Sequence, residues 1–348
     1  MAGPVRIVIV GVGRGRSHLR SVRALGERFE VAGVVDQDAA RLARVCAEEQ
    51  VAPDLAFPSL EEALTAGTCD AVMVATWART HEALVGQALD ADAHVLVEKP
   101  FTLTVASARR LLAVADERGR KVVVTQQWRY LPGQRTMRRL LAERRWGQPQ
   151  AGHMVSYKAR GGEYPDSEHS QLWQMTVHEV DSLIAMMGEP VAAVSGHSFR
   201  PPATTWRRES TATAELTLAG GCRVVLLSTS DARINTLELR VECEHGALRY
   251  ENSLSFGGVE RITVATSADG GWQPVALDAP HPLSLDAQVA AGFADWINGG
   301  PEPETSGRRN LQVLGALDAL LESGQTGRQV PVHVSGRGPE DSGGGPGC

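Results

Sequence analysis

The chain has 348 residues, of which 43% are hydrophobic and 22% are charged, so it is long enough and apolar enough for two domains with separate cores. Its formal net charge of −6 argues against a general nucleic-acid binder and favours a small, neutral or modestly charged ligand. The first residues lack the layout of a signal peptide and no apolar run is long enough to cross a membrane, which predicts a cytoplasmic protein without membrane contact. The five cysteines are scattered without CxxC spacing, which predicts reduced thiols and no metal site.

From residue 5 to about 126, short runs rich in valine and isoleucine alternate with helical patterns. Runs without polar alternation predict strands buried on both faces, and the helices between them predict a parallel, doubly wound sheet. Right-handed crossovers then place helices on both faces of that sheet. The predicted strands are 5–11, 29–36, 71–77, 94–99 and 121–127, and the predicted helices are about 16–27, 38–49, 59–66, 80–91 and 104–119.

A glycine motif follows the first predicted strand in "VRIVIVGVGRGRSH". Gly11 can make the tight turn, and Gly13 can let the backbone approach a pyrophosphate at the N-terminus of the next helix. The third glycine of GxGxxG is replaced by Arg16, while Gly15 stands one place early, so the packing of helix on strand is left open. The motif predicts a dinucleotide site, to which Arg14 could add positive charge.

The second predicted strand ends at Asp36, 25 residues beyond Gly11, about where an acid would accept both hydroxyls of a ribose. An acid at this place repels a 2′-phosphate and therefore favours NAD, although Arg41 and Arg44 stand close enough to keep NADP possible. The alternative is a domain of the same type that binds no phosphate, in which Asp36 caps a helix.

After about residue 130 the pattern changes to hairpins interrupted by a few helices, which is typical of an α+β domain. The predicted hairpins are 211–230, 236–251 and 261–277, and the predicted helices are 133–146, 170–188, 284–298 and 308–324. We expect an α/β fold with an N-terminal Rossmann-type doubly wound parallel sheet in residues 1–127 and a C-terminal α+β domain, with a largely antiparallel sheet, in residues 128–332. The glycine-rich residues 333–348 are expected to be disordered.

Polar side chains follow the predicted strands where ligands bind in a doubly wound sheet, beyond the carboxyl ends. Thr76 ends one strand, Glu98 and Lys99 end the next, and Gln127 ends another. Pro100 restrains Lys99 to an extended backbone. A lysine beside an oxidised nicotinamide would have a lowered pKa, as a proton shuttle needs, but a lysine at a strand end can also be a solvated exit from the sheet.

Two further stretches carry a resemblance to a known family. "VATWARTHEAL" (74–84) and "HVLVEKPFTLTVASARRL" (94–111) resemble the ATPxxxH and EKP patterns of the Gfo/Idh/MocA family. Ala75, Thr76 and His81 match the first pattern, where Trp77 replaces the usual proline, and Glu98-Lys99-Pro100 matches the second in full. Residues 306–332 resemble the closing helix and strand of the family, so the resemblance spans about residues 5 to 332.

The resemblance implies an NAD(P)-dependent oxidoreductase of sugars or cyclitols with Lys99 as the catalytic lysine. Glu98 would lie near the nicotinamide ribose, and Thr76, His81 and Gln127 are expected to line the cofactor. The resemblance also implies that the second sheet is open and that homo-oligomers form through it.

In the family, a DxGxHxxD segment supplies an aspartate and a histidine to the same site. On "LWQMTVHEVD" the histidine is His178 and the final acid is Asp181, while Gln174 stands where the first acid is expected. Gln174 can bind a sugar hydroxyl but cannot take a proton. The alternative is a surface histidine paired with Asp181. Further candidates for substrate contacts, each of which could also be structural, are Arg129, Tyr157, Tyr130, Lys158 and Arg160.

These observations predict hydride transfer between nicotinamide and a secondary alcohol or ketone, with Lys99 exchanging the hydroxyl proton and His178 assisting. A second possibility is a hydrolase or epimerase that oxidises its sugar transiently and keeps NAD bound. A third is a non-catalytic NAD(P) or sugar sensor, which the glutamine at position 174 motivates.

Overall fold

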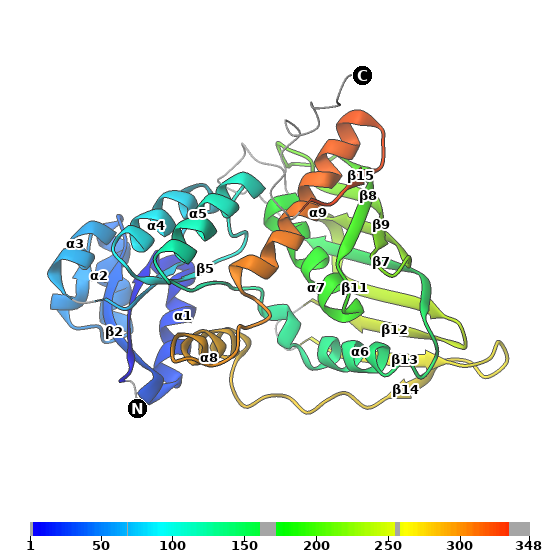
Figure 1. Cartoon of the computed structure of the whole chain (residues 1–348), viewed down its shortest axis with the longest axis horizontal. Coiled ribbons are helices and arrows are strands. Elements are labelled where there is room, and N and C mark those ends of the chain that lie inside the picture. Colours follow the sequence, from blue (N-terminus) through cyan, green and yellow to red (C-terminus); the bar gives the residue numbers. More distant parts are fainter. Residues whose placement is uncertain (1–2, 68, 161–171, 255–257, 334–348) are drawn as a thin grey trace, which may run out of the picture.

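The computed structural model describes residues 3–67, 69–160, 172–254 and 258–333. The chain forms two sheets that lie side by side, the first from the N-terminal third and the second from the C-terminal part (Figure 1). The predicted tail, residues 333–348, falls almost entirely outside the described residues, as do the first two residues of the predicted helix 170–188. None of the helices within the described ranges is long and apolar enough to cross a membrane.

The first sheet is parallel throughout and has the strand order β3-β2-β1-β4-β5-β6. Its strands are β1 (Val5–Val10), β2 (Phe29–Val35), β3 (Ala56–Phe57), β4 (Ala71–Val74), β5 (His94–Val97) and β6 (Val122–Val124). The connecting helices are α1 (Val12–Ala24), α2 (Ala39–Glu48), α3 (Leu60–Ala66), α4 (Ala78–Asp90) and α5 (Val105–Glu117). Every residue of β4 is buried, as expected for a strand covered on both faces. The predicted doubly wound sheet is confirmed.

The first helix differs from its predicted bounds. It begins at Val12 and not near residue 16, because Gly11 has a φ of +90° and turns the chain directly from β1 into α1. Gly13 therefore lies inside the first turn of the helix, where backbone N–H groups have no partner within the helix.

The second sheet has nine strands in the order β14-β13-β12-β11-β7-β10-β9-β8-β15 and is antiparallel except for the pair β7 and β10. Its strands are β7 (Pro149–Ala159), β8 (Val191–Phe199), β9 (Thr211–Leu218), β10 (Arg223–Thr229), β11 (Asp231–Cys243), β12 (Gly246–Asn252), β13 (Glu260–Ala265), β14 (Gln273–Val275) and β15 (Val330–Pro331). The three predicted hairpins form as β9/β10, β11/β12 and β13/β14. The predicted open, largely antiparallel sheet is confirmed.

Helices cover one face of this sheet. They are α6 (Pro132–Ala142), α7 (Val177–Met187) and α9 (Gly307–Thr326), and α7 is preceded by a π-helical turn, Leu172–Thr176. A fourth helix, α8 (Leu285–Ile297), packs instead on α1, and its Phe293 joins the core of the first sheet. The late part of the chain thus returns to the first sheet, while the domain boundary at residue 127 stays a prediction.

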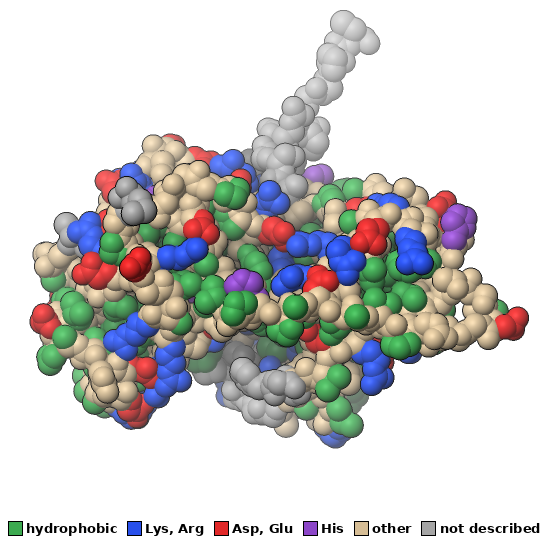
Figure 2. All heavy atoms as spheres, turned by 90° about the horizontal axis from the view of Figure 1, so that it is seen from below, with side chains coloured by type: hydrophobic (Ala, Val, Ile, Leu, Met, Phe, Trp, Pro, Cys, Tyr) green, Lys and Arg blue, Asp and Glu red, His purple; other side chains and the backbone are tan. Residues whose placement is uncertain are grey.

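The face seen from below in Figure 2 carries lysine, arginine and acidic side chains interspersed over both halves. Within the described ranges, no three histidine, cysteine or acidic side chains gather as metal ligands would.

Candidate active site

The first turn of α1 is shaped to receive a phosphate. A Cβ atom on Gly11 would lie 2.8 Å from the carbonyl oxygen of Ala75, so only glycine fits against the end of β4. A Cβ atom on Gly13 would meet nothing within 4 Å, so the space in front of the helix N-terminus is open. These positions fit the predicted pyrophosphate site, since open backbone at a helix N-terminus binds anions.

Gly15 resolves the irregular third position of the glycine motif. A Cβ atom there would lie 3.0 Å from the Cγ2 atom of Ile9 and 3.4 Å from the Cβ atom of Ala75. Close packing of the helix on the sheet, which the third glycine of GxGxxG normally permits, is therefore provided one residue early.

Asp36 lies buried beside this turn at the end of β2. Its Oδ2 accepts a hydrogen bond of 3.0 Å from the N–H of Val12, and its Oδ1 accepts one of 2.9 Å from the N–H of Asp38. The carboxylate thus caps α1, as the alternative interpretation held, yet each oxygen keeps a further lone pair for a ribose hydroxyl. Arg41 lies 3.4 Å from the same carboxylate, which keeps NADP possible.

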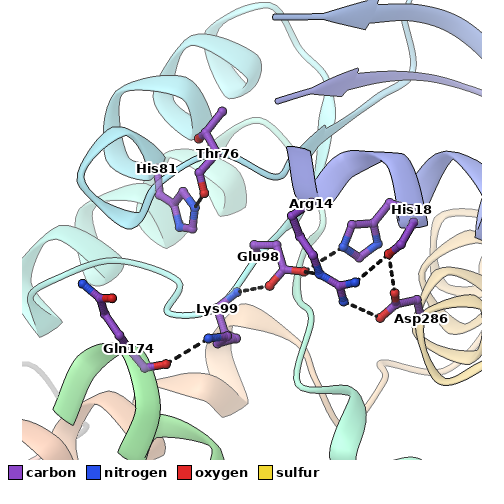
Figure 3. Close-up of polar contacts among 9 residues, drawn as sticks. Arg14, His18, Thr76, His81, Glu98, Lys99, Gln174 and Asp286 are labelled. Carbon is purple, nitrogen blue, oxygen red and sulfur yellow. Dashed lines mark hydrogen bonds and ion pairs between the residues drawn. The ribbon is translucent and has the colours of Figure 1, made fainter. Parts of the chain in front are cut away.

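Glu98 is held by two side chains of α1 at the rim of the sheet (Figure 3). Its Oε1 accepts hydrogen bonds of 2.7 Å from Nε of Arg14 and pairs at 2.8 Å with Nε2 of His18. Burial alone would raise the pKa of Glu98, but the hydrogen bond with His18 and the charge of Arg14 hold it well below its usual range. Arg14 also donates to Asp286 of α8 at 2.9 Å, so its predicted phosphate contact would have to compete with two carboxylates.

Lys99 follows Glu98 and lies between the two sheets. Its Nζ donates a hydrogen bond of 2.9 Å to the backbone carbonyl of Gln174, in the π-helical turn. Desolvation lowers the pKa of Lys99 to about 8, with Glu98 opposing this and the charge of Lys158 adding to it. A lysine with this pKa is populated in both protonation states near neutral pH, as an acid/base group must be.

His178 is buried, and its ring stacks on Trp128 with centroids 4.3 Å apart and planes 13° apart. Burial and the charges of Lys99 and Lys158 hold the pKa of His178 well below its ordinary value, so the ring is neutral at neutral pH. Its Nδ1 is buried and has no hydrogen-bond partner among the described residues. The alternative of a surface histidine paired with Asp181 is wrong.

Asp181 is instead paired with Arg129, which follows β6. Nε of Arg129 lies 2.9 Å from both carboxylate oxygens, and one Nη lies 2.6 Å from Oδ1. Both side chains are nearly inaccessible to solvent, at 9% and 2% exposure. The two predicted substrate residues therefore bind one another, and the geometry favours a structural role for the pair.

Two further predicted contacts are not supported by the geometry. Tyr157 on β7 is 39% exposed, and because its neighbours Ser156 and Lys158 contact Glu179 of α7, it points to the opposite face of the sheet, away from Lys99. His81 is fully buried, with Nδ1 2.8 Å from the carbonyl oxygen of Pro100 and Nε2 3.2 Å from that of Thr76, so both ring nitrogens contact the backbone and its contact with a cofactor stays a prediction.

The remaining predicted residues lie near the expected place. Thr76 follows β4 by two residues and lies beside Gly11, and its hydroxyl hydrogen-bonds that of Thr80 at 2.7 Å. Gln127 begins a short 3-10 turn after β6, and its Oε1 is buried without a partner among the described residues. Their contact with a cofactor stays a prediction.

Three important groups were not selected from the sequence. His18 lies four residues after Arg14, so helical spacing could have placed both on one face of α1. Glu179 and Asp286 gave no such signal, because their partners come from distant parts of the chain.

Comparisons with known proteins agree with this geometry. Residues 5–126 match the family described as "Oxidoreductase family, NAD-binding Rossmann fold", and residues 134–249 match the "GFO/IDH/MocA C-terminal domain". The chain is 29% identical to inositol 2-dehydrogenase 3 of Saccharopolyspora erythraea, over 96% of this chain and 97% of that protein. It is 27% identical to D-apiose dehydrogenase of Paraburkholderia graminis, over 91% of this chain and 86% of that protein.

Solved structures share the fold. The WlbA dehydrogenase from Bordetella pertussis, in complex with NADH and UDP-GlcNAcA, superposes with a TM-score of 0.79 at 22% identity, over 95% of this chain and 99% of that chain. The aldose-aldose oxidoreductase from Caulobacter crescentus superposes with a TM-score of 0.81 at 19% identity, over 94% of this chain and 99% of that chain.

Proposed function

The chain belongs to the GFO/IDH/MocA oxidoreductase family and carries its NAD-binding Rossmann fold, and we propose that it is a dehydrogenase of a sugar, sugar derivative or cyclitol that uses Lys99 as its acid/base. The relatives named as inositol and D-apiose dehydrogenases support this substrate class. The observation that carries the proposal is the position of Lys99, at the ligand rim of the first sheet with its Nζ 2.9 Å from the backbone carbonyl of Gln174 in the π-helical turn before α7.

The cofactor would be held by the open first turn of α1 at Gly13 and by Asp36. When bound, its nicotinamide supplies the acceptor or donor of the hydride. An acid at the ribose position supports NAD over NADP. Thr76 and Gln127 would lie along the cofactor, and Glu98, ionised and clamped by Arg14 and His18, would present a fixed negative charge near the oxidised ring.

During oxidation, neutral Lys99 would accept the hydroxyl proton of the substrate as the same carbon loses its hydride and becomes a carbonyl carbon. The ammonium so formed donates to the carbonyl of Gln174 and later releases the proton to solvent. During reduction, the ammonium returns the proton to the developing alkoxide. Neutral His178 would hydrogen-bond a neighbouring hydroxyl through its buried Nδ1, and the amide of Gln174 would orient the sugar without taking a proton.

The test is a titration with NADH and NADPH, followed by turnover with a panel of cyclitols, aldoses and ketoses, monitored by nicotinamide absorbance. We expect tighter binding of NADH and net hydride transfer with at least one polyol, which Lys99→Met abolishes and the control Lys121→Met does not. Lys121 suits the control because its ammonium lies over Trp296, 4.7 Å from the ring centroid, at the opposite end of the first sheet.

The same panel separates the alternatives. Isomerised or hydrolysed sugar without net NADH would indicate transient oxidation, and tight NAD(H) binding without turnover would indicate a sensor. Either result would contradict the dehydrogenase proposal.

We further propose that homo-oligomers form through the face of the second sheet opposite α6, α7 and α9. Val225 of β10 is 54% exposed there and lies across from His153 of β7 in the ladder. Tyr157, on the same face of β7, is 39% exposed. Large apolar side chains on an uncovered sheet are suited to protein contact. The cytoplasmic location also stays a prediction.

A further inference from the structure

Two ammonium groups, the partly buried one of Lys99 and the fully buried one of Lys158, lie at consecutive carbonyls of the π-helical turn Leu172–Thr176. Nζ of Lys99, from the first sheet, donates to the carbonyl of Gln174 at 2.9 Å, and Nζ of Lys158, from β7, donates to the carbonyl of Met175 at 2.8 Å. A π-helical turn shifts backbone carbonyls out of their α-helical pairing, and such turns occur frequently at functional sites. Here two carbonyls of the turn accept hydrogen bonds from lysines that come from both halves of the molecule.

Lys158 is held in place by Glu179, which follows His178 on α7. The ammonium lies 2.7 Å and 2.8 Å from the two carboxylate oxygens, and the hydroxyl of Ser156 donates to the same carboxylate at 2.9 Å. The side chains are 2% and 0% exposed, so both charges are taken fully out of water. Such burial costs several kcal/mol per ion, and an apolar pair of similar volume is often as stable, so stability alone gives little reason to keep the pair.

We infer that the buried Lys158–Glu179 ion pair is a positioning element of the active site, which fixes the carbonyls of the π-helical turn for Lys99 and sets the charge that the Lys99 ammonium meets. Neither residue needs to touch substrate, since the three contacts of Lys158 are already made within the protein. The inference rests on the proposed function, because it assigns to the pair the tuning of the proposed acid/base lysine.

The charges around Lys99 give the inference a direction. Glu98 and Glu179 favour its ammonium form, while Lys158 and Arg14 disfavour it, and buried His178 is neutral. Lys158 disfavours the ammonium form more than Glu179 favours it, as expected from its Nζ lying at the carbonyl next to the one that Lys99 contacts. Replacing the pair by neutral side chains should therefore leave Lys99 protonated to higher pH, even though one charge of each sign is removed.

The variants follow from the burial of the pair. Lys158→Met alone would strand the Glu179 carboxylate in the core, so the test uses Lys158→Met/Glu179→Gln, with Lys158→Arg as the conservative variant that keeps the charge. Tyr250→Phe serves as a control for stability, since it removes a partly buried hydrogen bond from β12 to Glu260 of β13, whose carboxylate also accepts from the N–H of Gly133 in α6.

Two readouts are compared in the full-length protein: the pH profile of turnover with the best sugar of the panel, and the pH dependence of acylation of the Lys99 amine, followed by mass spectrometry of its peptide. We expect the neutral pair to move both profiles to higher pH by about half a unit or more. Oxidation of the sugar at pH 7 should then fall more than its oxidation at pH 9, because oxidation needs the neutral amine. Lys158→Arg should restore the original profile, and Tyr250→Phe should leave it unchanged.

An unchanged Lys99 profile in the neutral-pair variant, with activity lost only in proportion to thermal stability, would overturn the inference. The amine titration requires no turnover and so separates the two proposals. If the profile of Lys99 shifts but no sugar is oxidised by any variant or by the unaltered chain, the positioning inference stands and the proposed function fails.

Discussion

The ammonium of Lys99 is anchored by the main chain of Gln174, and not by its side chain, across the junction between the two sheets. Family resemblance places an acid at position 174, and its replacement by glutamine raises the possibility of altered or lost activity. Because a backbone carbonyl makes the contact, the identity of the side chain does not decide whether Lys99 is held in place. Glutamine at this position is therefore compatible with an active acid/base lysine.

The first prediction concerns Lys99 itself. Lys99→Met should lower kcat by about 10² to 10⁴-fold, the usual contribution of a positioned acid/base group, while NADH still binds. Stopped-flow turnover and isothermal titration measure the two quantities. Loss of NADH binding together with turnover would mean that the substitution disrupts the site in general, and full turnover would exclude Lys99 as the acid/base.

The pH dependence should follow the lowered pKa of Lys99, which is about 8. Oxidation needs the neutral amine, so kcat/KM for the alcohol should rise about tenfold per pH unit below this pKa and level off above it. Reduction needs the ammonium, so the rate for the ketone should be level below pH 8 and fall above it. Profiles with the same sign in both directions would contradict the assignment.

The sequence was most informative where structure depends on local pattern. The runs of valine and isoleucine predicted β1, β2, β4, β5 and β6, because buried parallel strands need no polar alternation. Lys99 and Glu98 could be placed at a ligand rim because the carboxyl ends of parallel strands meet at one edge. The start of α1 was misjudged, since a single left-handed glycine replaces the whole expected loop.

Features that depend on tertiary contact could not be predicted. The π-helical turn before α7 is stabilised by lysines that lie 75 and 17 residues away in sequence. Tyr157 and Lys158 are neighbours with similar polar character, and only the packing of α7 shows which of the two faces the site. His81 matched a family pattern, but its buried contacts with two carbonyl oxygens indicate a structural role, which only the packing reveals.

The buried pair of Arg129 and Asp181 gives a third prediction. Asp181→Asn leaves an unpaired guanidinium in the core and should destabilise the fold by about 3–5 kcal/mol, whereas Arg129→Met/Asp181→Leu should cost less because no charge is stranded. Urea denaturation measures both. If Asp181 binds substrate as the sequence predicted, the double variant will instead fold normally and show a raised KM.

The open face of the second sheet gives a fourth prediction. Val225→Glu places a carboxylate on the proposed contact, beside Glu215 of β9 in the ladder, and an acid added without a cationic partner of its own is costly to bury in an interface. We expect a smaller particle by size-exclusion chromatography with light scattering, and an unchanged circular dichroism spectrum. An unaltered oligomer would place the contact elsewhere, and a monomeric unaltered chain would refute the proposed assembly.

The two glycines of the cofactor turn provide a matched pair for the last prediction. Gly13→Ala adds a methyl group to open space inside α1, where alanine is favoured over glycine by about 1 kcal/mol, so the thermal midpoint should stay level or rise. The same methyl group would stand in the path of the pyrophosphate, so the Kd for NADH should rise at least about tenfold, if the phosphates approach the backbone at this residue.

Gly11→Ala should instead destabilise the fold. Its Cβ atom would lie 2.8 Å from the carbonyl oxygen of Ala75, and its φ of +90° is unfavourable for alanine, so the midpoint should fall clearly. Differential scanning fluorimetry with and without NADH measures stability and binding together. Undiminished NADH binding by a stable Gly13→Ala variant would show that the cofactor phosphates lie away from this turn.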